Sequence, residues 1–263
     1  MIECRKWRRH KRMSQLELAL AADISQKHLS HLETGRSKPS REMVIKLSEA
    51  MNIPLRDRNQ LLQAAGFSAS YNESQLHDPA MKPVLNAVNS VLQHHDPFPA
   101  LVANRYWQAI KLNTAAENLF SSVISVDPRL QQIVAEEGMN IALLTVHEQG
   151  LRRYIANWPD VGPLLIRRLK GEADAAVDEK LQKTLHRYIR LAGDIHHANI
   201  VTAPLLPVLP LELTLPDIKL SLFSVIATFG TPQDITTDEI KMESFYPADS
   251  QTTEFFTKAL QVS

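Results

Sequence analysis

The sequence contains little cysteine, little glycine and no long apolar run. Cys4 is the single cysteine among 263 residues, which excludes a disulfide framework or a zinc site of several cysteines and is compatible with a reducing cytosol. The longest uncharged stretches, 198–211 and 220–233, are shorter than the roughly 20 apolar residues that a bilayer span needs. The basic N-terminus lacks the apolar region of a signal peptide. We therefore expect a soluble protein with no membrane partner.

The scarcity of glycine argues against several classes of enzyme. With 8 glycines in the chain, there is no phosphate-binding loop, no GxGxxG and no GxSxG, and HExxH is also absent. The pairs His94-His95 and His196-His197 suggest a metal site, but neighbouring residues on a helix diverge by about 100°, and no carboxylate or cysteine recurs at a ligand interval. We expect no catalytic residue, no metal and no resident cofactor.

The charges divide the chain into two parts, and the length fits about two domains. Residues 1–68 contain 13 Lys and Arg against 7 Asp and Glu, whereas residues 69–263 contain 16 against 22. A basic first part favours a polyanion as partner, while the acidic second part argues against nucleic acid along its own surface. Ordinary variation in surface composition is an alternative explanation for a difference of this size.

Residues 1–67 are expected to form an all-α domain of five short helices. Ser14 with Glu17 makes a capping box, Ser25 and Ser40 suit N-caps, and Gly35 suits a helix end. A helical-spacing set of apolar residues predicts one core; it comprises Leu16, Leu18, Ala19, Ala22, Ile24, Leu29, Leu32, Val44, Leu47, Ala50 and Ile53. Residues 68–80, rich in Ser, Asn and Gln, are predicted to be a linker.

Residues 81–263 are expected to form an α+β domain with an antiparallel sheet. Helices are predicted over 81–93, 114–124, 138–171 with a break at Trp158-Pro159, and 178–191. Strands are predicted over 98–104 and 107–113 about a tight turn, and over 209–215, 219–229 and 239–246 as an antiparallel meander.

Residues 14–35 have the spacing of a helix-turn-helix, with a reading helix at 25–34. At about 100° per residue, the polar side chains of this helix fall on the side opposite Leu29 and Leu32. Gln26 suits bidentate pairing with adenine, and Lys27 suits guanine. The residues expected at DNA, on base edges or on sugar-phosphate, are Ser14, Gln15, Ser25, Gln26, Lys27, His28, Ser30, His31, Arg36 and Lys38.

The basic run at residues 5–12 also resembles a nucleic-acid arm, but its spacing indicates a helix. Cys4, Trp7 and Met13 are expected to face the core. The cations Arg8, Arg9, Lys11 and Arg12 are then expected to spread over the solvent side. We predict that they attract phosphate without specificity and that most of them contact nothing in the specific complex.

Residues 1–66 resemble the XRE family of transcription regulators, also called lambda-repressor-like. The resemblance rests on 14–19, on Ile24-Ser25 and Leu29-Ser30, on 32–36, and on Pro39-Ser40 with Leu47 and Ala50. It implies binding to a double-stranded DNA operator, usually as a homodimer. Asp23 stands where many members have glycine, so slight backbone strain is expected there.

Most of residues 67–260 resemble the MmyB-like ligand-binding domain. The segments that carry the resemblance are 62–67, 78–81, 97–102, Trp107 with Asn113, 147–152, Asn157-Trp158, 228–232 and 245–249. The resemblance implies a PAS-like fold that holds a lipophilic effector such as a fatty acid. The sequence departs from the commonest form at His147-Glu148, where proline usually follows the histidine.

A bound acyl chain needs a donor for its carboxylate, because an isolated buried charge is strongly disfavoured. Arg152, with His147 and Asn157 near it, is the candidate, although an ordinary intramolecular ion pair is an equal alternative. Trp107 and Trp158 are expected to line the apolar part. The full set expected to bind ligand is Trp107, Asn113, His147, Arg152, Asn157 and Trp158.

The sequence therefore predicts a cytoplasmic, nucleoid-associated, homodimeric transcription regulator, a repressor that senses a lipophile. The competing interpretation is a DNA-binding regulator whose second domain only dimerises or binds another protein. An enzyme attached to a DNA-binding domain is disfavoured because no catalytic set of residues is present.

Overall fold

The computed structural model describes residues 2–193, 208–216 and 218–259, and its chain divides into two compact units. The first unit comprises residues 1–78 together with 229–238, and the second comprises 79–228 and 239–263. The division differs from the expected one, since most of the predicted linker and a short internal segment belong to the first unit. The pair His196-His197 lies outside the described residues.

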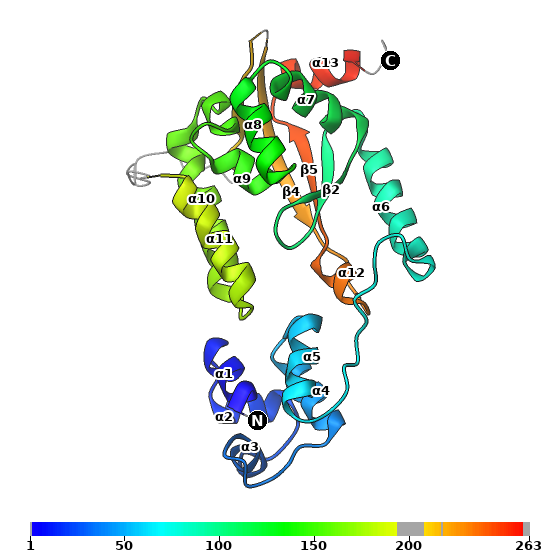
Figure 1. The fold of residues 1–263 in the computed structure, drawn as a ribbon, viewed down its shortest axis with the longest axis vertical. Coiled ribbons are helices and arrows are strands. Elements are labelled where there is room, and N and C mark those ends of the chain that lie inside the picture. Colours follow the sequence, from blue (N-terminus) through cyan, green and yellow to red (C-terminus); the bar gives the residue numbers. More distant parts are fainter. Residues whose placement is uncertain (1, 194–207, 217, 260–263) are drawn as a thin grey trace. The chain divides into compact units, whose positions relative to one another are not determined.

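The first unit contains the five expected helices (Figure 1). Their bounds are α1 Ile2–His10, α2 Gln15–Ala21, α3 Gln26–Glu33, α4 Arg41–Ala50 and α5 Leu55–Ala64. Ser14 forms the predicted capping box with Glu17, and the hydroxyls of Ser25 and Ser40 cap α3 and α4. The sequence therefore placed each of these starts correctly, because the capping side chains are local signals.

The core of this unit is as expected apart from two residues. Trp7, Leu18, Leu29, Leu32 and Leu47 are among its buried members. Leu16, predicted to be in the core, is 52% exposed, and Arg8, predicted to face solvent, is only 8% exposed. A period of about 3.6 defines a face but not its width, so residues at its margin can fall on either side.

The turn between α2 and α3 has the conformation expected of Asp23. Its φ is 46°, in the left-handed region that glycine adopts freely and other residues adopt at a cost. Lys46 Nζ donates to the backbone oxygen of Asp23 at 3.3 Å. The tight turn thus keeps α3 at its angle to α2 without the glycine that is common there.

The second unit is built on a five-stranded antiparallel sheet. The strands are β1 Ala100–Ala103, β2 Ala109–Leu112, β3 Leu211–Thr214, β4 Lys219–Ala227 and β5 Lys241–Pro247. Their order is β2-β1-β5-β4-β3, so the predicted meander β3-β4-β5 is confirmed and β1 pairs with β5 to join it to the early hairpin. The unit is therefore α+β.

Helices cover this sheet (Figure 1). Their bounds are α6 Lys82–His95, α7 Thr114–Ile124, α8 Pro128–Glu137, α9 Ile141–Val146, α10 Trp158–Ala175, α11 Glu179–Leu191 and α13 Ser250–Ala259; the short α12, Ile235–Glu239, spans the boundary between the units. The main core joins α7 to α11 with one side of the sheet. The break at Trp158-Pro159 is the start of α10, whereas α8, α12 and α13 were not predicted. None of the described helices is long and apolar enough to cross a membrane.

Candidate DNA-binding surface and ligand cavity

α3 presents a polar side opposite its packing side. Leu29 and Leu32 are fully buried in the core of the first unit. Gln26 and Lys27 at the start of the helix are exposed, while Ser30 and His31 are partly exposed. Within the described part of the chain, neither Gln26 nor Lys27 has a side-chain partner. Such an arrangement suits a helix whose first residues enter the major groove.

The other residues predicted at DNA surround this helix. Ser14, Ser25, Arg36 and Lys38 are exposed, and His28 is partly exposed. Gln15 differs, because its Nε2 already donates one of its two N–H groups to Glu33 Oε2 at 2.8 Å. Their contacts with DNA remain predictions, and the second N–H of Gln15 Nε2 is the donor left for a phosphate.

Glu33, at the end of α3, fixes that helix to α1 and α2. Arg8 Nε and Nη2 donate to its two carboxylate oxygens at 2.6 and 2.8 Å, and Arg8 Nη1 donates to the Met13 carbonyl at 2.8 Å. Burial alone raises the pKa of Glu33, but the hydrogen bonds from Arg8 and Gln15 outweigh it, so the pKa is lowered. This ionic pair is bidentate, which fixes orientation as well as charge.

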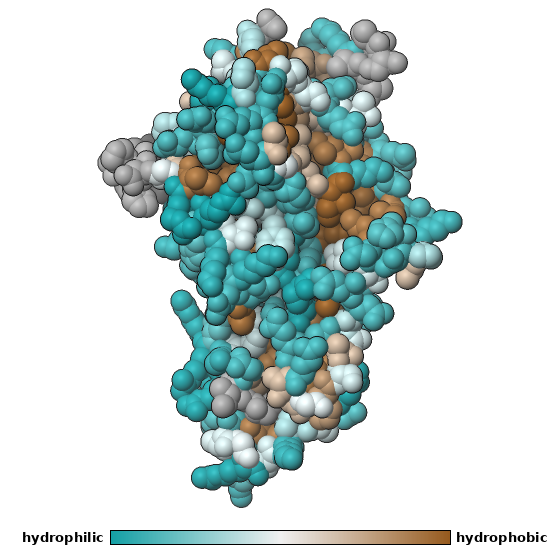
Figure 2. Space-filling view, viewed as in Figure 1, coloured by the Kyte–Doolittle hydropathy of each residue, from teal (hydrophilic) through white to brown (hydrophobic). Residues whose placement is uncertain are grey.

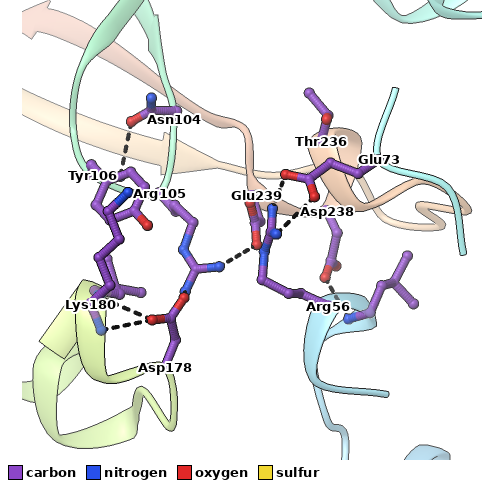
Figure 3. Close-up of polar contacts among 12 residues, drawn as sticks. Arg56, Glu73, Asn104, Arg105, Tyr106, Asp178, Lys180, Thr236, Asp238 and Glu239 are labelled. Atoms are coloured by element: carbon purple, nitrogen blue, oxygen red, sulfur yellow. Dashed lines mark hydrogen bonds and ion pairs between the residues drawn. The ribbon is translucent and has the colours of Figure 1, made fainter. Parts of the chain in front are cut away.

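Segment 229–238 is a structural part of the first unit. Pro54 precedes α5 and provides no side-chain cap, so Asp238 Oδ2 instead accepts from the Leu55 N–H at 2.9 Å (Figure 3). Asp234 Oδ2 accepts from the Ser74 N–H at 3.1 Å. The predicted linker is therefore partly bound, and α5 receives its cap from 183 residues away in the sequence.

The residue that follows Asp238 is held within the second unit. Arg105, in the turn between β1 and β2, donates to Glu239 at 2.7 Å and to Asp178, the N-cap of α11, at 3.0 Å (Figure 3). Consecutive residues thus bind different units.

The second unit contains an apolar cavity of about 140 Å³. The sheet contributes Leu222 and Phe245, α9 contributes Ile141, and α10 contributes Val161 and Leu165 among others. An engineered cavity of roughly 150 Å³ lined by apolar side chains binds benzene. This cavity is therefore large enough for one small apolar group.

A second cavity of about 70 Å³ adjoins the first. Its lining includes Phe120 and Val123 of α7 and also Tyr154. The residues that line both cavities are Ile141, Thr145, Leu211, Leu222 and Phe245. These five residues form the wall that the two cavities share.

The first cavity has a charged end. Arg168 of α10 and Glu243 of β5 line it beside Trp107. Trp107 is fully buried, has a φ of 64° and donates from Nε1 to Glu172 at 2.9 Å, while Arg168 lies 4.6 Å above its ring. A left-handed conformation is strained for such a bulky residue, and such strain clusters at functional sites.

Burial shifts the ionisation of two groups at this end. It raises the pKa of Glu243 despite the charge of Arg168 and a hydrogen bond with Ser224. It lowers the pKa of Lys241, although Lys241 forms an ion pair with Glu172. The site therefore favours the neutral form of Glu243 more than water does.

The predicted ligand residues are separated in the structure. Trp107 lines the first cavity, but the other five line neither cavity. Arg152 donates to the Ala192 carbonyl at 2.6 Å, and its guanidinium stacks 4.8 Å above the ring of Trp158. Arg152 also forms an ion pair with Glu148 at 3.8 Å. Its contacts are therefore intramolecular, as in the alternative that the sequence left open, but they include a backbone carbonyl as well as a carboxylate.

The remaining residues of that set make local contacts. Asn113 caps α7 and also accepts from the Ala100 N–H, and Asn157 accepts from the Glu212 N–H at 3.0 Å. His147 ends α9 and accepts from the Gln149 N–H at 3.1 Å. In the described ranges, no group of three or more His, Cys, Asp or Glu is placed to hold a metal.

Sequence reasoning did not find the charged end. α10 carries three basic residues close together, Arg167, Arg168 and Lys170, and only packing selects Arg168 for the cavity. Glu243 lies in a strand of mixed polarity, where alternation does not say which face is buried. A glutamate within a predicted strand is the one signal that was available, since a buried Glu is rare without a partner.

Comparison with known families matches both units. Residues 84–259 match the model of the MmyB-like transcription regulator ligand binding domain, and residues 5–57 match a helix-turn-helix family. A search of curated proteins finds no match to the chain. The matched models describe transcription-regulator domains that bind DNA and a ligand.

Proposed function

Because the chain belongs to the MmyB-like transcription regulators, with a DNA-binding helix-turn-helix before a ligand-binding domain, we propose that it is a repressor responding to a lipophilic molecule such as a fatty acid. It acts in the cytoplasm, at the nucleoid. The observation that supports a lipophilic ligand is the pair of adjoining apolar cavities between the sheet and α7, α9 and α10.

An elongated apolar ligand fits these cavities better than a compact polar one. Their shared wall consists of four apolar side chains and Thr145. Burial of each methylene group contributes about 0.8 kcal/mol. A chain that extends from the first cavity into the second therefore gains affinity with length, until both spaces are filled. The second domain resembles PAS domains in this use of an internal site beside an antiparallel sheet.

Operator binding is assigned to the exposed side of α3. Gln26 and Lys27 are available for base edges, and Arg36 and Lys38 for phosphates. The buried pair Arg8–Glu33 supports the orientation of α3. A reading helix held in this way loses little freedom on binding, which favours affinity.

Segment 229–238 supplies a route from ligand to DNA. β4 and β5 line the cavity through Leu222 and Phe245, and the chain between these strands enters the first unit, where Asp238 caps α5. A ligand changes DNA affinity only if it binds two arrangements of the protein differently. Displacement of the shared wall by an acyl chain provides that difference.

The homodimer is proposed to form through the second unit. Figure 2 shows hydrophobic surface in the region of α6, β4 and β5, whose exposed large apolar residues are Val91, Val225, Ile226 and Tyr246. Phe223 stacks on Tyr246 with ring centroids 5.5 Å apart, which holds the ring in place. Exposed apolar surface of this kind marks interaction sites.

The lipophile is tested by mass spectrometry of small molecules released from the denatured purified protein. A long-chain acid or similar lipophile, present at a constant ratio to the chain, supports the proposal. Protein that carries none and binds none from a mixture of lipids would instead support the competing interpretation, in which the second domain only dimerises.

A further inference from the structure

An apolar ligand alone leaves the charged end of the first cavity without a purpose. Arg168 and Glu243 both line a space whose other walls are mainly apolar. When an apolar ligand fills the cavity, the charged side chains beside it lose their water molecules. This loss costs free energy unless polar atoms of the ligand replace the hydrogen bonds to water. The ligand is therefore expected to carry polar atoms at this end.

The two charged groups do not satisfy one another. Arg168 Nη1 is 3.9 Å from Glu243 Oε1, which is longer than a hydrogen bond. Arg168 Nε is buried, and no acceptor for it exists among the described residues. The nearby carboxylate of Glu172 is engaged through Oε2, which accepts from Trp107 Nε1 and from Lys241 Nζ. The Nε–H of Arg168 is therefore a hydrogen-bond donor without an acceptor among the described residues, and it lies beside the cavity.

We propose that Arg168 and Glu243 together bind the carboxylate of an acidic lipophile, with one proton held between that carboxylate and Glu243. The guanidinium pairs with the ligand anion, and the Glu243 carboxyl donates its proton in a hydrogen bond to it. The chain of the ligand runs from this end along the apolar wall. This inference rests on the proposed function and specifies the head of its ligand.

The charge balance requires that proton. Glu172 and Lys241 neutralise each other, so Arg168 leaves one positive charge when Glu243 is neutral. One carboxylate then makes the site neutral. With Glu243 ionised, the ligand would bring a second carboxylate to a site that is already compensated, and two buried like charges are strongly unfavourable. The site consequently binds the ligand anion together with the protonated Glu243.

A decrease of affinity with rising pH follows from this balance. The groups that face Glu243 are Arg168 and Glu172 on α10, Lys241 on its own strand, and the Ser224 hydroxyl on β4. Burial raises the pKa of Glu243, so the neutral form persists to higher pH than in water. Above that pKa, each pH unit costs about tenfold in affinity for the acid, since one proton must be taken up.

The test is calorimetric titration of the full chain, stripped of bound lipid, with dodecanoic acid, dodecanol and methyl dodecanoate. The variants are Arg168→Gln, Glu243→Gln and Arg152→Gln, with Arg167→Gln as the control on an exposed position of the same helix as Arg168. Arg168→Gln should lower the affinity for dodecanoic acid by about 10- to 100-fold, because the carboxylate loses a charged hydrogen-bond partner. It should leave the alcohol and the ester nearly unchanged, which also reports that the variant is folded.

Glu243→Gln provides the second arm of the test. The amide still donates a hydrogen bond but does not titrate, so acid binding should persist and its pH dependence should flatten. If the affinity of Glu243→Gln for the acid still fell with rising pH, the titrating group would be another one, such as Lys241, and the inference would be overturned. An equal loss of acid and ester in Arg168→Gln, or a selective loss in Arg152→Gln instead, would also overturn it.

The two proposals fail in different ways. Binding of all three probes with equal affinity at every pH would remove the role of Arg168 and Glu243 but keep the lipophile site. Failure of all three probes to bind would remove both proposals.

Discussion

At the scale of the residue, the buried pair Arg8–Glu33 joins α1 to α3 in the DNA-binding unit. Glu33→Ala leaves a buried guanidinium without its anion, and breaking a buried pair in this way costs about 3–5 kcal/mol. Urea unfolding of the full chain should show this loss in the first unit. The double change Arg8→Met with Glu33→Met should recover much of it, because no charge is left unpaired; an equal or larger loss would contradict the account.

The same pair predicts a dependence on pH. The pKa of Glu33 is lowered in the folded protein, so its contribution is complete above the unfolded pKa and is lost as pH falls through the lowered value. Wild-type stability of the first unit should thus decline in acid more steeply than that of Glu33→Gln. Parallel acid profiles for the two proteins would show that the carboxylate is not stabilised there.

The residues predicted to contact DNA separate into those expected to contact base edges and those expected to contact phosphates. Lys27→Ala should cost about 1–3 kcal/mol on the specific operator and little on random DNA, because it removes a base contact. Lys38→Ala should instead weaken binding to all sequences and lower the salt slope by about one unit. Fluorescence anisotropy at several salt concentrations measures both effects. Equal losses on specific and random DNA for Lys27→Ala would identify another helix as the reader.

At the scale of the element, α5 depends on a cap from segment 229–238. Asp238→Ala removes the acceptor for the Leu55 N–H, and loss of a cap costs about 0.5–2 kcal/mol. Hydrogen exchange should accelerate in α5, while Asp238→Asn, which keeps an acceptor oxygen, should retain most of the protection. Unchanged exchange in Asp238→Ala would show that the segment does not support α5.

The elements also divide what sequence predicts from what it does not. The starts of capped helices were located because Ser14, Ser25 and Asn113 cap N–H groups only a few residues away. The strands were located from an equally local signal, their β-rich composition between turn residues. The role of segment 229–238 was missed, since the cap on α5 forms across 183 residues. Trp107 was predicted at the ligand site from the resemblance to the MmyB-like domain, whereas the choice of Arg168 over Arg167 depends on how α10 packs.

At the scale of the whole molecule, the proposed homodimer sets the spacing expected of the operator. Two copies of α3 should protect half-sites about 34–36 Å apart, or a multiple of that distance. Val225, which is 48% exposed, is proposed to lie in the contact between the copies. Val225→Lys should therefore yield a monomer in analytical ultracentrifugation, with weaker operator binding. A Val225→Lys protein that stays dimeric would place the dimer contact elsewhere.

Coupling between ligand and DNA is the central claim for the molecule. The two cavities, of about 140 and 70 Å³, hold a long acyl chain only if their shared wall moves. β4 and β5 contribute Leu222 and Phe245 to that wall and continue into the segment that caps α5. We expect the ligand-free arrangement to bind DNA and the ligand-bound arrangement to release it. Coupling energies of this kind usually change affinity by roughly 5- to 150-fold.

The most direct measurement is the affinity of the lipid-free full chain for an operator selected from random DNA, determined at increasing dodecanoic acid. The account predicts that operator affinity falls by a factor within that range and then levels off. By linkage, saturating operator should weaken binding of the acid by the same factor. An operator affinity that is identical with and without bound acid would contradict the account, because the second unit would then hold a ligand without sensing it.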